Sequence, residues 1–198
     1  MRCFQLHTEG NTADKSLAFV DQPPDGLGLY DVYLSEGDPI GDRYPANARI
    51  SLRPSYPGIR LSSLLGNCLC FLIVNTAIKD IFVAEAKAAV EALPFTLLNH
   101  KKRVHSRDYW IINPLAIVDC VDKEHSEIVY FDESKTTVVA VNKFVFDARK
   151  LEGQPPLFRV PEARTEYFIT VELARALKQH DFSNMRVSEI EVRNGSPQ

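Results

Sequence analysis

Glycine and proline are distributed very unevenly along this chain of 198 residues. The first 66 residues contain seven of the nine glycines and six of the twelve prolines, whereas residues 67–152 contain no glycine and only Pro94 and Pro114. Because these residues mark turns and interrupt regular elements, the sequence predicts a front of short strands joined by turns over residues 1–66. Longer regular elements are expected after residue 67.

Apolar spacing indicates which elements follow this front. A buried strand is predicted over residues 68–74, and Asn75 or Thr76 then caps a helix whose apolar positions recur up to Leu93, where Pro94 ends it. Residues 95–99 and 109–115 are expected to pair as a hairpin, and Thr170 to cap a second helix. Further strands are predicted from β-branched and aromatic residues over 127–132, 137–146, 157–160 and 187–192.

These elements predict a single α+β domain over residues 1–193. No repeat or linker divides the chain, and a domain of this size buries roughly 70% of the surface of its unfolded chain. We expect a mainly antiparallel sheet with two principal helices, a loop-rich N-terminal third (1–66), a scaffold (67–193) and a frayed tail (194–198).

Composition argues against several functional classes. The formal charge of −3 disfavours a basic nucleic-acid binder, and the longest apolar run, residues 68–74, is far shorter than the roughly 20 residues of a membrane helix. No signal peptide is recognisable, so a cytoplasmic protein without direct nucleic-acid or membrane contact is expected. Cys68 and Cys70 are expected to lie on the core side of a strand, and no zinc-finger spacing, phosphate loop or catalytic signature is present. We therefore expect no catalytic residue, metal or cofactor.

One segment concentrates negative charge. Residues 119–133 contain six carboxylates and one lysine, so their net charge is −5. Such a segment is compatible with a solvated turn, with a metal or acid–base site formed by Asp119, Asp122 and His125, or with an acidic surface for a basic partner. The candidate binding residues are Asp119, Asp122, Glu124, Glu127, Tyr130, Phe131, Asp132 and Glu133.

Arg159 is the second polar residue of interest. It precedes Pro161, which is typical of a sheet edge. We expect its guanidinium to pair with a carboxylate of the acidic segment and thereby to fix the sheet.

Several ordered motifs resemble those of a known family. They are the run Asp-Tyr-Trp-Ile-Ile-Asn-Pro-Leu at 108–115, Val-Asp-Cys-Val-Asp at 118–122 with Ser126, Phe-Val-Phe at 144–146, Phe158-Arg159 with Glu162, and Phe-Ile-Thr-Val at 168–171. Over roughly residues 45–192 the sequence resembles a bacterial family of polymorphic-toxin immunity proteins first described from myxobacteria. Its general character suggests a locus that encodes a type VI secretion effector.

The resemblance implies a non-enzymatic, cytoplasmic inhibitor that binds a cognate toxin and blocks its active site. Nucleases are the commonest toxins that act in the cytoplasm, so a nuclease is the expected partner, and a homo-oligomer is compatible with the sequence. The acidic segment is the candidate surface, because it could occupy a groove that binds phosphate. The alternatives are an effector-specific secretion chaperone and a metal-assisted hydrolase that uses the acidic segment.

Overall fold

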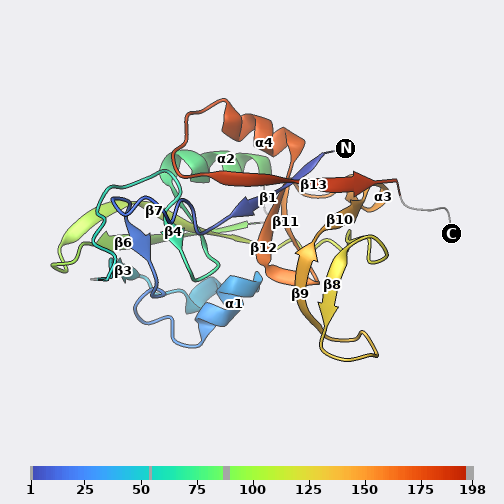
Figure 1. Cartoon of the computed structure of the whole chain (residues 1–198). Coiled ribbons are helices and arrows are strands. Elements are labelled where there is room, and N and C mark those ends of the chain that lie inside the picture. Colours follow the sequence, from blue (N-terminus) through green and yellow to red (C-terminus); the bar gives the residue numbers. More distant parts are fainter. Residues whose placement is uncertain (1, 54, 87–89, 195–198) are drawn as a thin grey trace.

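The strand nearest the N-terminus, β1 (Cys3–His7), lies in the middle of the largest sheet of the protein (Figure 1). In the computed structural model, which describes residues 2–53, 55–86 and 90–194, that sheet has five strands in the order β10-β13-β1-β12-β11. The other members are β10 (Val145–Asp147), β11 (Leu157–Val160), β12 (Ala163–Thr170) and β13 (Arg186–Arg193). All neighbours are antiparallel except β10 and β13. The scaffold therefore begins at β1 in the glycine-rich front and not at residue 67.

A second sheet contains the predicted hairpin. Its order is β3-β6-β7-β5. The members are β3 (Arg49–Ser51), β5 (Leu72–Asn75), β6 (Val90–Leu98) and β7 (Val104–Pro114). The short strands β2 (Phe19–Val20) and β4 (Gly66–Asn67) pair with each other, as do β8 (Glu127–Tyr130) and β9 (Val138–Lys143). The result is the predicted α+β fold with a mainly antiparallel sheet.

The first long helix, α2 (Thr76–Ala86), begins as predicted but does not reach Leu93. The Asn75 side chain accepts a hydrogen bond from the Ile78 N–H (3.1 Å), which is a helix N-cap. Residues 87–89 lie outside the described part, and from Val90 the chain is strand β6. The helix prediction is wrong there because positions 93, 95 and 97 are buried alternately, the period of a strand, and β6 pairs along its length with β7. Pro94 fits because β3 pairs only with residues 96–98 of β6.

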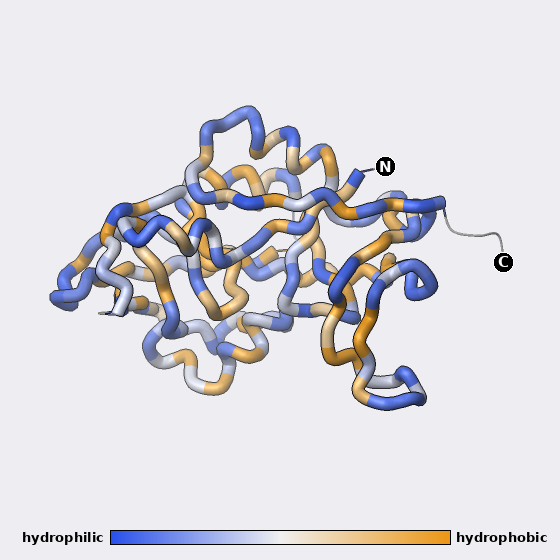
Figure 2. Tube along the Cα trace, in the orientation of Figure 1, coloured by the Kyte–Doolittle hydropathy of each residue, from blue (hydrophilic) through white to orange (hydrophobic). Residues whose placement is uncertain are grey.

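Two layers of side chains enclose the five-stranded sheet. Leu6, Tyr167 and Ile169 point to one face, where α2 and α4 (Val171–Lys178) cover them, while Phe168 and Ile190 point to the other (Figure 1). Strand residues alternate between faces, and β1, β11 and β12 accordingly contribute to both cores. The hydrophobic stretches of the tube accordingly run through the interior, and hydrophilic ones mark its loops (Figure 2). Helix α4 follows Thr170, and β11 occupies residues 157–160, as predicted.

The pair of cysteines is not in a strand. Strand β5 begins at Leu72, Cys68 is exposed, and Cys70 has a left-handed backbone (φ +56°). The Asn67 side chain organises this turn by accepting hydrogen bonds from the N–H groups of residues 69 and 71 and donating to the carbonyls of residues 65 and 71. The prediction of a strand with both thiols facing the core is therefore wrong.

Three short helices were not predicted: α1 (Tyr30–Glu36), the 3-10 turn η1 (Gly41–Arg43) and α3 (Ala148–Leu151). The strand predicted over 137–146 is divided into β9 and β10. Of the tail predicted over 194–198, residues 195–198 lie outside the described part. Among the described residues, no helix is long and apolar enough to span a bilayer.

Candidate functional site

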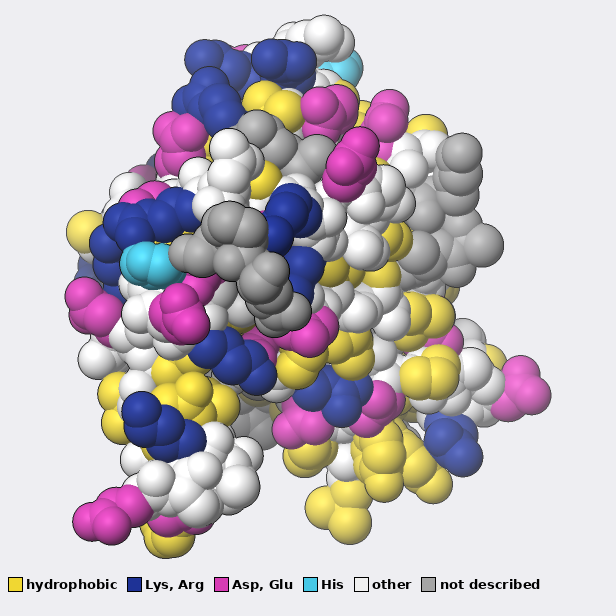
Figure 3. Space-filling model, turned by 90° about the vertical axis from the view of Figure 1, so that its right-hand side faces the viewer, with side chains coloured by type: hydrophobic (Ala, Val, Ile, Leu, Met, Phe, Trp, Pro, Cys, Tyr) yellow, Lys and Arg dark blue, Asp and Glu magenta, His cyan; other side chains and the backbone are white. Residues whose placement is uncertain are grey.

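Two elements project from the same side of the molecule, and a cleft lies beside one of them. They are the α1 arm (residues 29–36) and the hairpin arm (residues 127–143, β8 and β9), both at the lower edge in Figure 1. Figure 3 shows hydrophobic side chains gathered on two projections along that edge. The cleft has a volume of about 890 Å³ and is walled by β9 on one side and by the turn between β11 and β12 on the other.

The α1 arm is held from behind by two arginines of the sheet. The guanidinium of Arg159 on β11 donates hydrogen bonds to the carbonyls of Leu34 (3.3 Å) and Ser35 (2.6 Å). Arg164 on β12 donates to the carbonyl of Glu36 (3.0 Å) and to the carboxylate of Asp38 (2.5 Å). The carbonyls at the end of a helix lack intrahelical partners, so these arginines satisfy groups that would otherwise need water.

Arg159 does not pair with the acidic segment, contrary to the prediction. It is fully buried, donates to the Tyr167 hydroxyl (2.8 Å) and to the Arg164 carbonyl, and lies 4.2 Å above the Tyr167 ring. Carbonyl oxygens and the ring face thus take the place of a carboxylate. The prediction failed because α1, which supplies two of the four hydrogen-bond acceptors, was not visible in the sequence.

Gly37 shows how closely α1 approaches the sheet. Its φ of +82° ends the helix, and a Cβ atom at this position would lie 2.7 Å from the Arg159 side chain and 2.9 Å from the Pro114 carbonyl oxygen. Only glycine meets both requirements.

The outer surface of the α1 arm is apolar and exposed. Leu29 is 85% exposed, and Tyr30, Val32 and Tyr33 are each 40% or more exposed. The two tyrosine rings lie 5.8 Å apart, and the Arg43 guanidinium lies over Tyr30 at 5.4 Å. Tyrosine and arginine on an apolar patch are the residue types that dominate protein interfaces.

The hairpin arm also exposes apolar side chains. Phe131 at its tip is 77% exposed, Val139 is 62% exposed, and Val129 is 40% exposed. Figure 2 shows hydrophobic segments along the projecting strands and a hydrophilic tip. Tyr130 is half-buried, and the Lys135 ammonium lies 6.0 Å from its ring.

The structure divides the predicted acidic residues between the base and the tip of the hairpin arm. Asp119, Asp122 and Glu124 belong to the base, Glu127 begins β8, and Asp132 and Glu133 are exposed at the tip. Base and tip are separated by the length of β8, about 13 Å for four strand residues. The predicted residues therefore do not form one continuous patch.

Asp122 has a local structural role at the base. It is only 11% exposed, and it accepts hydrogen bonds from the His125 ring (2.8 Å) and from the Glu124 N–H (3.1 Å). Desolvation acts to raise the pKa of the Asp122 carboxyl, but these hydrogen bonds outweigh it, so the pKa lies below its usual value. This is the geometry of a side-chain-capped turn.

Cations accompany several of the other acids. Lys150 approaches Asp119 (3.6 Å), and Lys123 forms an ion pair with Glu162 (2.9 Å) that raises the pKa of Lys123. Figure 3 shows Lys and Arg intermixed with Asp and Glu over that face. Asp119 thus lies near Lys150, whereas Asp122 pairs with His125. Among residues 2–53, 55–86 and 90–194, no group of three or more His, Cys, Asp or Glu is arranged to hold a metal ion.

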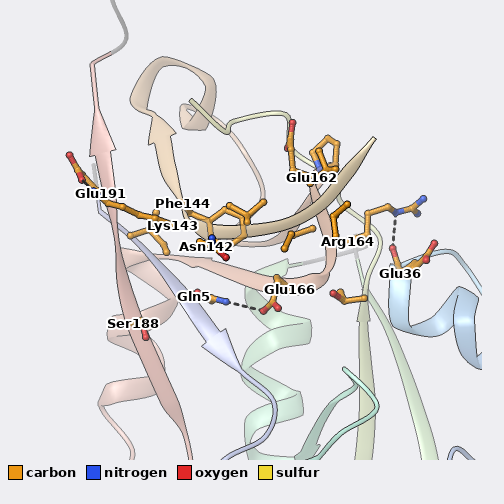
Figure 4. A pocket seen from close by; sticks show the side chains of 18 of the residues that line it. Gln5, Glu36, Asn142, Lys143, Phe144, Glu162, Arg164, Glu166, Ser188 and Glu191 are labelled. Carbon is orange, nitrogen blue, oxygen red and sulfur yellow. Dashed lines mark hydrogen bonds and ion pairs between the residues drawn. The ribbon is translucent and has the colours of Figure 1, made fainter. Parts of the chain in front are cut away.

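The floor of the cleft is polar (Figure 4). Gln5 on β1 donates a hydrogen bond to Glu166 on β12 (2.9 Å), and Lys143 of β9 pairs with Glu191 of β13 (2.9 Å). The lining includes two cationic residues, Lys143 and Arg164, and five glutamates, Glu36, Glu162, Glu166, Glu189 and Glu191. The cleft is therefore more acidic than the chain as a whole.

Sequence reasoning missed the α1 arm entirely. Leu29, Tyr30, Val32 and Tyr33 are spaced so that they share one face of a helix, and such a stripe normally indicates core. No sequence signal distinguishes an exposed stripe from a buried one. Only the contacts on the opposite side of α1, through Leu34 and the two arginines, turn this stripe outward.

A family model described as "Immunity protein family (Imm11)" matches residues 5–192, nearly the whole chain. No curated protein matches.

Proposed function

The chain belongs to the Imm11 immunity protein family, and we propose that it neutralises its cognate toxin by binding the toxin with both the α1 arm and the hairpin arm. Family membership supports the toxin-immunity role and confirms the resemblance of the motifs after residue 45 to those of an immunity protein family. The match also includes the front segment, which supplies β1 and the α1 arm.

The observation that carries this proposal is the pair of exposed apolar surfaces that project from the same side of the molecule, with the cleft beside the hairpin arm. Leu29, which is 85% exposed, and the exposed Tyr30 and Tyr33 belong to none of the hydrophobic cores formed by the described residues, and neither does Phe131. Interfaces that bind tightly concentrate their free energy in a few such aromatic anchors. The nonpolar arms would supply the affinity, and the acidic cleft would supply the electrostatic fit.

We propose that the toxin is a nuclease and that its active site is covered. A nuclease carries a basic groove for phosphate, and the glutamates of the cleft together with Asp132 and Glu133 at the tip offer charge of the opposite sign. Such a toxin acts in the cytoplasm, so the immunity protein would be retained there, as part of a type VI secretion locus. The predicted residues Asp119, Asp122, Glu124, Glu127 and Tyr130 would contribute at the edge of this interface.

Binding and protection test the proposal together. We expect the toxin domain encoded next to this protein to co-purify with it, with a Kd of about 1 nM or tighter, and co-expression to rescue growth. The double variant Tyr33→Ser, Phe131→Ser should weaken binding by about 100-fold or more. The matched control is Val104→Ser, an exposed valine at the far end of β7.

Each possible failure has a distinct meaning. Loss of binding by the control as strongly as by the double variant would place the interface elsewhere. Tight binding without protection against the isolated toxin domain would instead indicate a secretion chaperone.

A further inference from the structure

Strand β9 has a neighbour on one edge only. Among the described residues, β9 pairs with β8 and with no other strand. Its six residues, Val138–Lys143, and the following Phe144 all line the cleft in succession. A strand that presented one of its faces would contribute alternate residues, so β9 presents its open edge, with its backbone N–H and carbonyl groups, to the cleft.

The composition of this edge favours pairing. Residues 138–142 read Val-Val-Ala-Val-Asn and contain neither a charge nor a proline, the two residue types that most often protect exposed edges. The pairing with β8 also shifts register twice, so that Val139 and Asn142 have no opposite residue on β8. Strand β9 is therefore rich in residues of high β-propensity, and not all of its residues are paired within the hairpin.

The chemistry of the cleft indicates what kind of segment fits beside β9. Both cations in the lining are already paired, Lys143 with Glu191 and Arg164 with Asp38. Three of the five glutamates also have cationic partners: Glu162 pairs with Lys123, Glu189 with Arg2, and Glu191 with Lys143 and Arg193. Among the described residues, Glu36 and Glu166 have no ion pair, and they are the carboxylates open to a further cation. One oxygen of the Glu162 carboxylate, which is only 3% exposed, has no hydrogen-bond partner. Figure 4 shows Gln5 and Glu166 on the floor beneath β9. An extended segment that carries lysine or arginine complements this lining.

We propose that β9 binds an extended basic segment of the cognate toxin by strand addition, so that the segment becomes the third strand of the β8–β9 sheet. The backbone of the segment pairs with the open edge of β9, and its cationic side chains reach the glutamates of the floor. This inference rests on the proposed function, since it takes the toxin as the partner, and it specifies how one part of the interface is formed.

Two proline variants test the backbone pairing. Val139→Pro and Asn142→Pro alter positions that are not opposite a β8 residue, so they disturb the hairpin's own ladder least, and a proline in β9 disfavours the addition of another strand at its edge. We expect each to weaken binding of the purified toxin domain by about 10- to 100-fold, measured by calorimetry. The matched control Val139→Thr keeps the N–H and the β-propensity, and it should stay within about 3-fold of the wild type.

Hydrogen exchange of the wild-type complex provides a second measurement that needs no variant. Amides of residues 138–143 should exchange at least about 10-fold more slowly with toxin bound, because newly bonded amides are protected. Unchanged exchange there, or unchanged affinity of the folded proline variants, would overturn the strand addition while leaving the toxin-binding function intact.

Two further outcomes are distinguishable. If wild-type protein does not bind the toxin at all, the proposed function fails and not only this inference. If the free wild-type protein sediments as a dimer that Val139→Pro dissociates, the edge is occupied by a second copy of this chain, and the proposal is wrong.

Discussion

The α1 arm and the hairpin arm expose similar apolar surfaces but are held in different ways. The α1 arm is a helix of seven residues whose terminal carbonyls are bound by Arg159, buried beneath it, and by Arg164. The hairpin arm is attached near its base, where Ile128 and Val141 pack against the core and Ser126 exchanges hydrogen bonds with the backbone of Val145 (2.9 and 3.1 Å). Its projecting end is held by its own ladder, whose register shifts twice.

Because of this difference, we expect the two arms to lose different amounts of conformational entropy when a toxin binds. A surface already fixed by the fold loses little conformational freedom when a partner binds, whereas the projecting end of a hairpin, which is held by its own ladder, loses more. We therefore expect α1 to act as the preorganised anchor and the hairpin as the adaptable arm. Four experiments bear on this contrast.

The largest effect is expected from Arg159→Met, which removes the anchor of α1. Two carbonyls of α1, the Arg164 carbonyl and the Tyr167 hydroxyl would lose a buried donor. The free energy of unfolding in urea should fall by about 3 kcal/mol or more. Arg175→Met, at an exposed position of α4, is the control and should change stability by less than about 0.5 kcal/mol. Equal stability of Arg159→Met and wild type would show that α1 does not depend on this arginine.

The second effect compares the arms by single substitutions. Tyr30→Ala and Tyr33→Ala should each lower toxin affinity by about 2 kcal/mol, and Phe131→Ala by about 1 kcal/mol, because ordering the hairpin offsets part of what Phe131 contributes. Calorimetry on all three variants measures the loss of binding free energy for each one and so ranks the three side chains. A larger loss for Phe131 than for both tyrosines would reverse the assignment of anchor and adaptable arm.

The third effect concerns association rate. Reversal of Glu124, Glu127 and Glu133 to lysine should slow kon by about 10-fold at low ionic strength, and the difference should shrink as salt screens charges beyond about 10 Å. Asp122 is excluded from this set because its side chain holds the turn at the base of the arm. Stopped-flow measurements of kon for the wild type and the triple variant at two salt concentrations test this expectation. A salt-independent loss would indicate damage to folding and not lost steering.

The smallest effect is the pH dependence contributed by Asp122. Its pKa is lowered in the folded state, so the carboxylate contributes stability that is complete above its unfolded pKa, near 4, and is lost as pH falls through the folded pKa. Unfolding free energies between pH 6 and pH 2 should therefore fall more steeply for the wild type than for Asp122→Asn. At neutral pH the variant should lose less than about 1 kcal/mol. Parallel curves would remove Asp122 as a stabilising group of the hairpin base.

Local pattern determined much of this fold in advance. The unbroken Leu-Phe-Arg-Val run became β11, Asn75 and Thr170 preceded the two long helices, and the hairpin around residues 99–103 formed where turn residues interrupted two apolar runs. These elements are readable because periodicity, capping and turn chemistry depend only on neighbours within a few residues. The motifs after residue 45 were sufficient to indicate the immunity family for the same reason: they are local.

Tertiary structure decided what depends on partners distant in the sequence. Residues 89–93 fit a helical period, yet pairing with β7 makes residues 90–93 a strand; Cys3–His7 lies in a segment typical of loops, yet β12 and β13 hold it at the centre of a sheet. The functional surface is the extreme case. Leu29, Tyr30 and Tyr33 have the pattern of a core stripe, and they face solvent because Arg159, more than 120 residues away, binds the carbonyls on the opposite side of α1. Burial is a property of the whole packed chain, so an amphipathic stripe specifies which residues share a face but not whether that face turns inward.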